Sequence, residues 1–195
     1  MQTTNKRREQ TKKLALLALL TAIVAVLAYF GGFIKVGANA SIALTLIPIV
    51  IGSALLGPYA GAWLGGISGA VFFLTADAVF WLGLSIPGTI ITVMLKGILS
   101  GLCAGFAYKL LEKVNRYLAV LVSAVVCPVV NTGIFILGCF VFFMDTVTGG
   151  ATAEGMSIGG YIIIFFVGLN FVLELLANII LSPAILRIIN IRKKD

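Results

Sequence analysis

Long uninterrupted runs of apolar residues are the feature that most restricts what this chain can fold into. A bilayer core of ~30 Å is crossed by a helix of about 20 apolar residues, and several runs of that order lie between residues 14 and 189. Hydrophobic residues make up 61% of the 195 residues and charged residues only 11%, whereas a soluble domain is roughly half apolar and a quarter charged. A soluble fold of this size has too much surface to bury that apolar material. The chain is therefore expected to fold in lipid.

The fold class that follows is an all-α membrane protein. We predict one integral membrane domain over residues 1–195, a compact bundle of six transmembrane helices preceded by a basic tail at 1–13. The spans are expected at about 14–33, 42–56, 59–75, 88–111, 118–144 and 161–189. The second of these runs is short for a span.

The distribution of charge predicts the orientation. Twelve of the 14 lysine and arginine residues fall in the two tails or in the loop 109–117, and only Lys35 and Lys96 lie elsewhere. The acidic residues Asp77, Asp145 and Glu154 fall in the opposite loops. This is the positive-inside pattern, so both termini are predicted to be cytoplasmic. Topology explains the basic tails, so no nucleic-acid partner is expected.

A signal peptide is the competing interpretation of the N-terminus. A basic segment, an apolar stretch and Ala-Asn-Ala at 38–40 resemble such a signal with its cleavage site. However, the apolar stretch of about 20 residues exceeds the 7–15 that are usual for a signal peptide. We therefore expect the first helix to remain in the protein.

Several kinds of chemistry are excluded by the residues present. There is no histidine, and the three cysteines have no CxxC spacing, so no metal site, cofactor or disulfide is expected. Lys96 and Ser100 form the only nearby Ser–Lys spacing, and a nucleophilic serine also needs a placed base and an oxyanion site. We expect no catalytic residue.

Small residues recur at helical spacing in three places. One glycine series is Gly57, Gly61, Gly65 and Gly69, and a second is Gly97, Gly101 and Gly105. These two series predict close packing between helices inside the bundle. The first helix carries an alanine stripe of Ala15, Ala18, Ala22 and Ala25. This stripe either packs internally or forms a smooth outward surface for another membrane subunit.

Polar residues within the spans are the candidates for a binding site, because a charge near the midplane costs at least ~2.5–3.5 kcal/mol. Lys96, Asn131, Asn170 and Glu174 fall at depths that allow them to meet in one pocket open to the outside. The alternative is a structural Lys96–Glu174 ion pair, with the two amides linking helices. The outer loops add the candidates Asn39, Asp77 and Trp81.

A resemblance to a known family gives these patterns a role. Residues 41–52, Ser-Ile-Ala-Leu-Thr-Leu-Ile-Pro-Ile-Val-Ile-Gly, run on to Leu-Leu-Gly-Pro at 55–58 and to glycines at 61, 65 and 69. This pattern resembles the substrate-binding (S) component of energy-coupling factor (ECF) vitamin transporters of prokaryotic cytoplasmic membranes. The resemblance implies a subunit that binds a vitamin from outside, with the first loop as a lid. Such a subunit then reorients on a transmembrane coupling subunit driven by two ATP-binding-cassette ATPases.

The resemblance also implies roles for specific residues. The docking motif AxxxA of that family falls on Ala18 and Ala22, and Ala15 and Ala25 extend it. The chain has no GxxxxGK[ST] loop, so ATP hydrolysis is expected from the partner ATPases. Residues 44–48 and Asn131-Thr132 look closest to the pantothenate-like branch, and Lys96 suits a ligand carboxylate. Riboflavin, a queuosine precursor or another small vitamin stays open as the substrate.

Two other classes of protein are alternatives. A small secondary transporter or channel often shows internal repeats with broken helices, and no convincing repeat is found in this sequence. An intramembrane enzyme would depend on the weak Lys96–Ser100 spacing alone.

Overall fold

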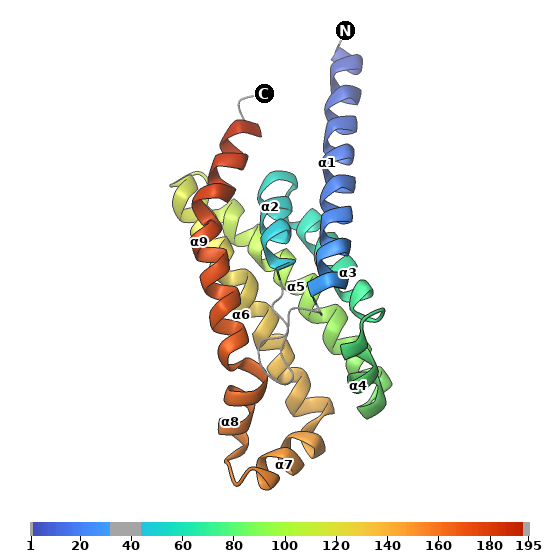
Figure 1. The fold of residues 1–195 in the computed structure, drawn as a ribbon. Coiled ribbons are helices and arrows are strands. Elements are labelled where there is room, and N and C mark those ends of the chain that lie inside the picture. Colours follow the sequence, from blue (N-terminus) through green and yellow to red (C-terminus); the bar gives the residue numbers. More distant parts are fainter. Residues whose placement is uncertain (1, 32–43, 193–195) are drawn as a thin grey trace.

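The computed structural model of the chain describes residues 2–31 and 44–192, and every regular element in these ranges is a helix. The elements are α1 (Gln2–Gly31), α2 (Leu46–Leu56), α3 (Pro58–Phe72), α4 (Ala76–Leu84), α5 (Ile86–Leu111), α6 (Arg116–Phe142), α7 (Met144–Ala153), α8 (Ile158–Tyr161), a π-helical segment (Ile162–Val167) and α9 (Gly168–Arg192). The prediction of an all-α fold is confirmed. Both ends of the chain lie at one end of the bundle, and α4, α7 and α8 lie at the other (Figure 1).

In the described part of the chain, four helices are long and apolar enough to cross a membrane, namely α1, α5, α6 and α9. α3 and α4 add a fifth span if the pair, which is bent by 84°, is counted as one. α2 is apolar but has only 11 residues. The structure thus supports four or five spans by length, and the count of six stays a prediction.

Two segments expected to be loops contain helices. Residues 76–84 form α4, whose first turn carries Asp77, where a carboxylate interacts favourably with the helix dipole. The segment is apolar but too short to cross a bilayer, so its length concealed it in the sequence. Residues 144–161 likewise contain α7 and α8. The basic tail, which contains no proline or glycine, is the first part of α1.

A sharp turn joins α2 to α3. Gly57 has φ +100°, which an L side chain rarely adopts, and Pro58 occupies the first turn of α3, where its missing N–H is not needed. This pair of residues brings α3 back along α2.

The glycine series pack as the sequence predicted. A Cβ on Gly65 would overlap the carbonyl oxygen of Gly97, and one on Gly61 would overlap that of Gly101. A Cβ on Gly105 would lie 2.5 Å from Cα of Pro58. α3 and α5 therefore meet backbone to backbone along three successive layers, which only glycine permits.

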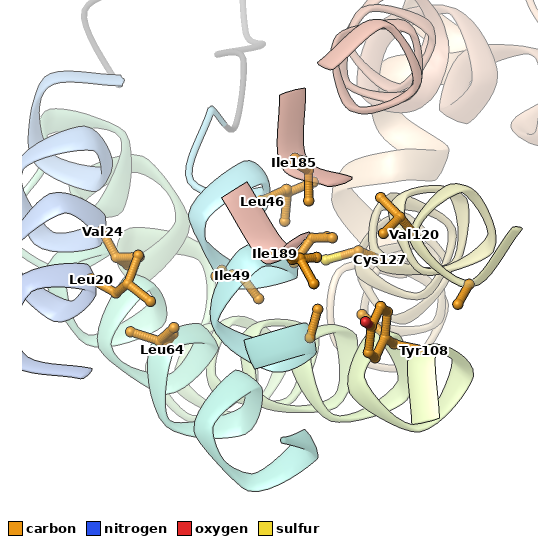
Figure 2. Packing of buried hydrophobic residues seen from close by; sticks show 14 residues of the cluster. Leu20, Val24, Leu46, Ile49, Leu64, Tyr108, Val120, Cys127, Ile185 and Ile189 are labelled. Atoms are coloured by element: carbon orange, nitrogen blue, oxygen red, sulfur yellow. The ribbon is translucent and has the colours of Figure 1, made fainter. Parts of the chain in front are cut away.

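The main core fills the half of the bundle nearest the termini. In Figure 2, Leu20 and Val24 of α1 point toward Leu64 of α3, and all three side chains are buried. On the other side, Ile185 and Ile189 of α9 lie against α2. α2 is thus the central element, packed by α1 and α3 on one side and by α9 on the other.

Candidate functional site

Lys96 lies on α5 ten residues after Ile86, about 15 Å from the helix start, in the half of the bundle away from the termini. Its ammonium group faces two aromatic rings. Nζ is 5.8 Å from the ring centroid of Phe72, at the end of α3, and 5.2 Å from that of Phe135, on α6. Ring faces attract a cation and offset part of the cost of holding the charge at this depth.

Trp81 joins the same group of rings from α4. Its ring centroid lies 5.4 Å from that of Phe135 and 5.2 Å from that of Phe143, both in edge-to-face geometry. The position of Trp81 is fixed through its backbone, because the Thr89 hydroxyl donates to the Trp81 carbonyl oxygen at 2.7 Å. We call Lys96 together with Phe72, Trp81, Phe135 and Phe143 the Lys96 cluster.

Glu174 brings α9 to this cluster. The side chain is 4% exposed and lies close enough to Lys96 for a favourable electrostatic interaction. A buried carboxylate needs such a partner, since an uncompensated charge in the interior is strongly destabilising. The Lys96–Glu174 proximity fits both sequence interpretations, the pocket and the structural pair.

Two polar residues that the sequence analysis missed continue the Glu174 face of α9. Asn178 and Ser182 are each 1% exposed, and the Asn178 amide nitrogen donates to the Glu174 carbonyl oxygen at 2.9 Å. Asn178 Oδ1 and Ser182 Oγ have no hydrogen-bond partner among the described residues. The signal was present in the sequence, because Glu174, Asn178 and Ser182 follow one another at intervals of four and so share a helix face.

Three of the other expected site residues lie on helices that contribute to this group. Asn131 is half-buried on α6, one turn before Phe135 and on the same helix face. Asp77 is half-buried in the first turn of α4, one turn before Trp81. Asn170 belongs to α9, one turn before Glu174. Asn39 lies outside the described residues.

The structure thus brings together Lys96, Trp81 and Glu174 of the expected set. Three further members of the cluster, Phe72, Phe135 and Phe143, were not among the expected site residues. Phenylalanine is common in lipid-exposed helices, so its presence alone does not mark a site. Their positions in the fold distinguish these rings: Phe72 on α3 and Phe135 on α6 face Lys96, and Phe143 after α6 packs against Trp81.

The geometry of Ser100 argues against a Ser–Lys catalytic pair. Ser100 is fully buried, and its hydroxyl donates to the Gly97 carbonyl oxygen at 2.9 Å. The proton is thus directed to the helix backbone and away from Lys96. Among the described residues no group of three or more His, Cys, Asp or Glu side chains is placed to hold a metal ion.

The alanine stripe of α1 faces away from the bundle. Ala15, Ala18 and Ala22 are exposed and Ala25 is half-buried, whereas Leu20 and Val24 on the opposite side of the helix are buried. α1 is also the least buried of the four long helices. Of the two alternatives from the sequence, the exposure favours the outward surface.

Comparison with known proteins yields one match. The model of a family described as "ECF transporter, substrate-specific component" matches residues 12–186. No curated protein and no solved structure matches the chain.

Proposed function

The chain belongs to the family of ECF transporter substrate-specific components, and on this premise we propose that it captures a small vitamin outside the cell for an ATP-driven importer. The end of the bundle that carries both termini is the cytoplasmic end, in agreement with its basic residues. The Lys96 cluster then lies in the outer half of the membrane, where a ligand arrives.

The observation that carries the binding site is a lysine within an apolar span whose ammonium group faces the rings of Phe72 and Phe135. Trp81 of α4 packs on Phe135 and extends this group of rings. A pocket for a small molecule is mostly apolar with a few placed polar groups, and this cluster has that composition. An ammonium group in such surroundings binds a carboxylate strongly, because few waters compete for either charge. Asn131, Asn170, Asp77 and Asn39 are proposed to complete the polar contacts.

Pantothenate is the proposed substrate. It carries one carboxylate, which pairs with Lys96, and its amide and hydroxyl groups suit asparagine side chains. Riboflavin and a queuosine precursor, which are flat heterocycles, would instead stack on the rings of the cluster. The two kinds of ligand therefore make different demands on Lys96 and on Trp81.

A fluorescence titration tests the site, because the chain has only two tryptophans, Trp63 and Trp81. Trp81 belongs to the cluster, whereas Trp63 is 55% exposed and its indole donates to Thr21 on α1. A ligand that binds at the cluster changes the emission of wild type and of the Trp63→Phe variant. It leaves the emission of Trp81→Phe unchanged. The reverse dependence would place the ligand elsewhere.

Lys96→Met tests the substrate class, with Lys109→Met at the far end of the same helix as its control. A charge-assisted hydrogen bond contributes about 1.5–3 kcal/mol, so pantothenate affinity falls about 10- to 150-fold in Lys96→Met. Lys109→Met binds as wild type. If pantothenate binds neither wild type nor control but riboflavin does, the substrate is wrong, and the fluorescence titration is repeated with riboflavin to test the site. If no vitamin binds, the proposed function fails.

Docking on the coupling subunit is proposed to use the outward alanine stripe. Small side chains allow another helix to approach closely without a hydrophobic driving force. Ala18→Leu with Ala22→Leu then abolishes uptake and leaves vitamin binding intact. The control is Ala70→Leu, which makes the same kind of substitution once, on the exposed face of α3. Loss of binding in the α1 variant would show that the stripe is internal packing.

A further inference from the structure

A groove lies on the lipid-facing side of α9, at the end of the bundle that carries both termini. It encloses about 270 Å³ and is lined by Pro183, Leu186, Arg187, Asn190 and Ile191. The spacing of these residues places them on one side of the helix. Ile185 and Ile189, which are buried against α2, occupy the other side.

The surface next to the groove is apolar and exposed. Ile191 at its mouth is 59% exposed, and Ile180, about three turns deeper on the same face, is 71% exposed. In a chain that spans a bilayer such side chains contact lipid tails. An occupant of the groove therefore has an apolar part that extends toward the membrane centre.

The polar part of the groove is cationic. Arg187 is exposed and lies within the apolar stretch Phe171–Ile191 of α9. Arg116, the first residue of α6, reaches across, and its Nη1 donates to Asn190 Oδ1 at 3.5 Å. An arginine this close to the end of a span extends toward the headgroups, whose phosphates are the natural counter-charge.

We propose that this groove is a binding site for an anionic phospholipid. The phosphate lies between Arg187 and Arg116, the amide nitrogen of Asn190 donates to it, and one acyl chain follows Pro183 toward Ile180. Basic pockets between helices at a membrane surface recognise anionic headgroups in this way. The apolar floor favours a lipid over free phosphate, which would use only the arginines. This site is independent of the vitamin site and does not rest on the proposed function.

Native mass spectrometry of the delipidated full chain in detergent tests the proposal. The probes are dioleoyl phosphatidylglycerol, dioleoyl phosphatidylcholine and inorganic phosphate. Wild type is expected to bind phosphatidylglycerol about tenfold more tightly than phosphatidylcholine. Arg116→Gln with Arg187→Gln loses this preference. Arg7→Gln with Lys109→Gln, which removes the same charge from α1 and α5 at the same end of the bundle, keeps it.

Three results would overturn the proposal. In the first, wild type binds both lipids equally. In the second, both double variants lose the preference to the same extent, which would mean a general effect of surface charge. Alternatively, millimolar inorganic phosphate would displace phosphatidylglycerol, which would mean a site for a free anion.

A second measurement keeps both arginines, and it decides the question if the arginine variant does not fold. Ile191→Trp introduces a fluorophore at the exposed mouth of the groove. Phosphatidylglycerol with brominated acyl chains should quench the added emission at much lower mole fractions than brominated phosphatidylcholine. Equal quenching by both lipids would mean that the groove has no anionic lipid site.

Discussion

The glycine contact between α3 and α5 leads to a sharp prediction about stability. Gly65 and Gly66 are neighbours on α3, yet a methyl group would meet different surroundings at each. At Gly65 it overlaps the backbone carbonyl of Gly97, whereas at Gly66 the nearest atom is Cγ1 of the Ile98 side chain at 3.4 Å, an ordinary contact distance. Gly65→Ala is therefore expected to destabilise the protein and Gly66→Ala is not.

The magnitude follows from two opposing terms. Alanine in place of glycine in a helix interior gains about 1 kcal/mol of helix propensity at either position. At Gly65 the overlap forces the two backbones apart, and overpacking of this kind costs about 1–3 kcal/mol. The variants should differ by about 2 kcal/mol, which for a chain of this length corresponds to about 4–8 °C in Tm.

Thermal unfolding in detergent, followed with a thiol-reactive dye, measures this difference. Cys127 and Cys139 are fully buried, so they become reactive only when the helices separate. Gly66→Ala should unfold at or above the temperature of wild type and Gly65→Ala below it. Equal Tm values for the two variants would refute the backbone-to-backbone contact of α3 and α5.

Three further outcomes are expected. In the folded protein a maleimide reacts with half-buried Cys103 before it reacts with Cys127 or Cys139; fast labelling of either buried thiol would contradict the packing. Asn115→Ala removes the side-chain oxygen that accepts two backbone N–H groups at the start of α6. Stability should fall by about 1 kcal/mol, and an unchanged Tm would mean that the cap does not matter. Thr92→Val should leave Tm unchanged or raise it, because the buried hydroxyl has no partner among the described residues; a clear drop in Tm would reveal a bond to that hydroxyl.

The packing of the bundle was predictable from the sequence where glycines recur at helical spacing, because they indicate close contact between helices. Glycines spaced by four, such as Gly61 and Gly65, predicted that helices pack closely inside the bundle, because glycine allows two backbones to touch. The structure identifies the two helices as α3 and α5. Lys96 and Glu174 were singled out for a different reason, because a charge within an apolar span is costly and needs a partner or a ligand.

The rest of the cluster depends on tertiary structure. The rings of Phe72 and Phe135 lie near the ammonium group of Lys96. The sequence around them does not show this, because a phenylalanine in a membrane helix can equally contact lipid. The bend of 84° between α3 and α4 was also not visible, and it is this bend that directs Trp81 back over α6. A span-by-span interpretation treats such short helices as loops.

The alanine stripe shows how exposure favours one of two alternatives that periodicity leaves open. A face of small residues fits internal packing and external docking equally well. The buried positions of Leu20 and Val24 identify the inner side of α1, so the stripe with Ala18 and Ala22 lies outside.

The central claim is that this chain binds a vitamin for a transporter whose energy comes from other subunits. Uptake of a radiolabelled vitamin, chosen as the one that the purified protein binds, tests it most directly. Cells that carry the chain together with the coupling subunit and both ATPases should accumulate the vitamin, and cells that carry the chain alone should not. Accumulation by the purified chain alone in proteoliposomes, driven only by an ion gradient, would contradict the claim and identify a secondary transporter.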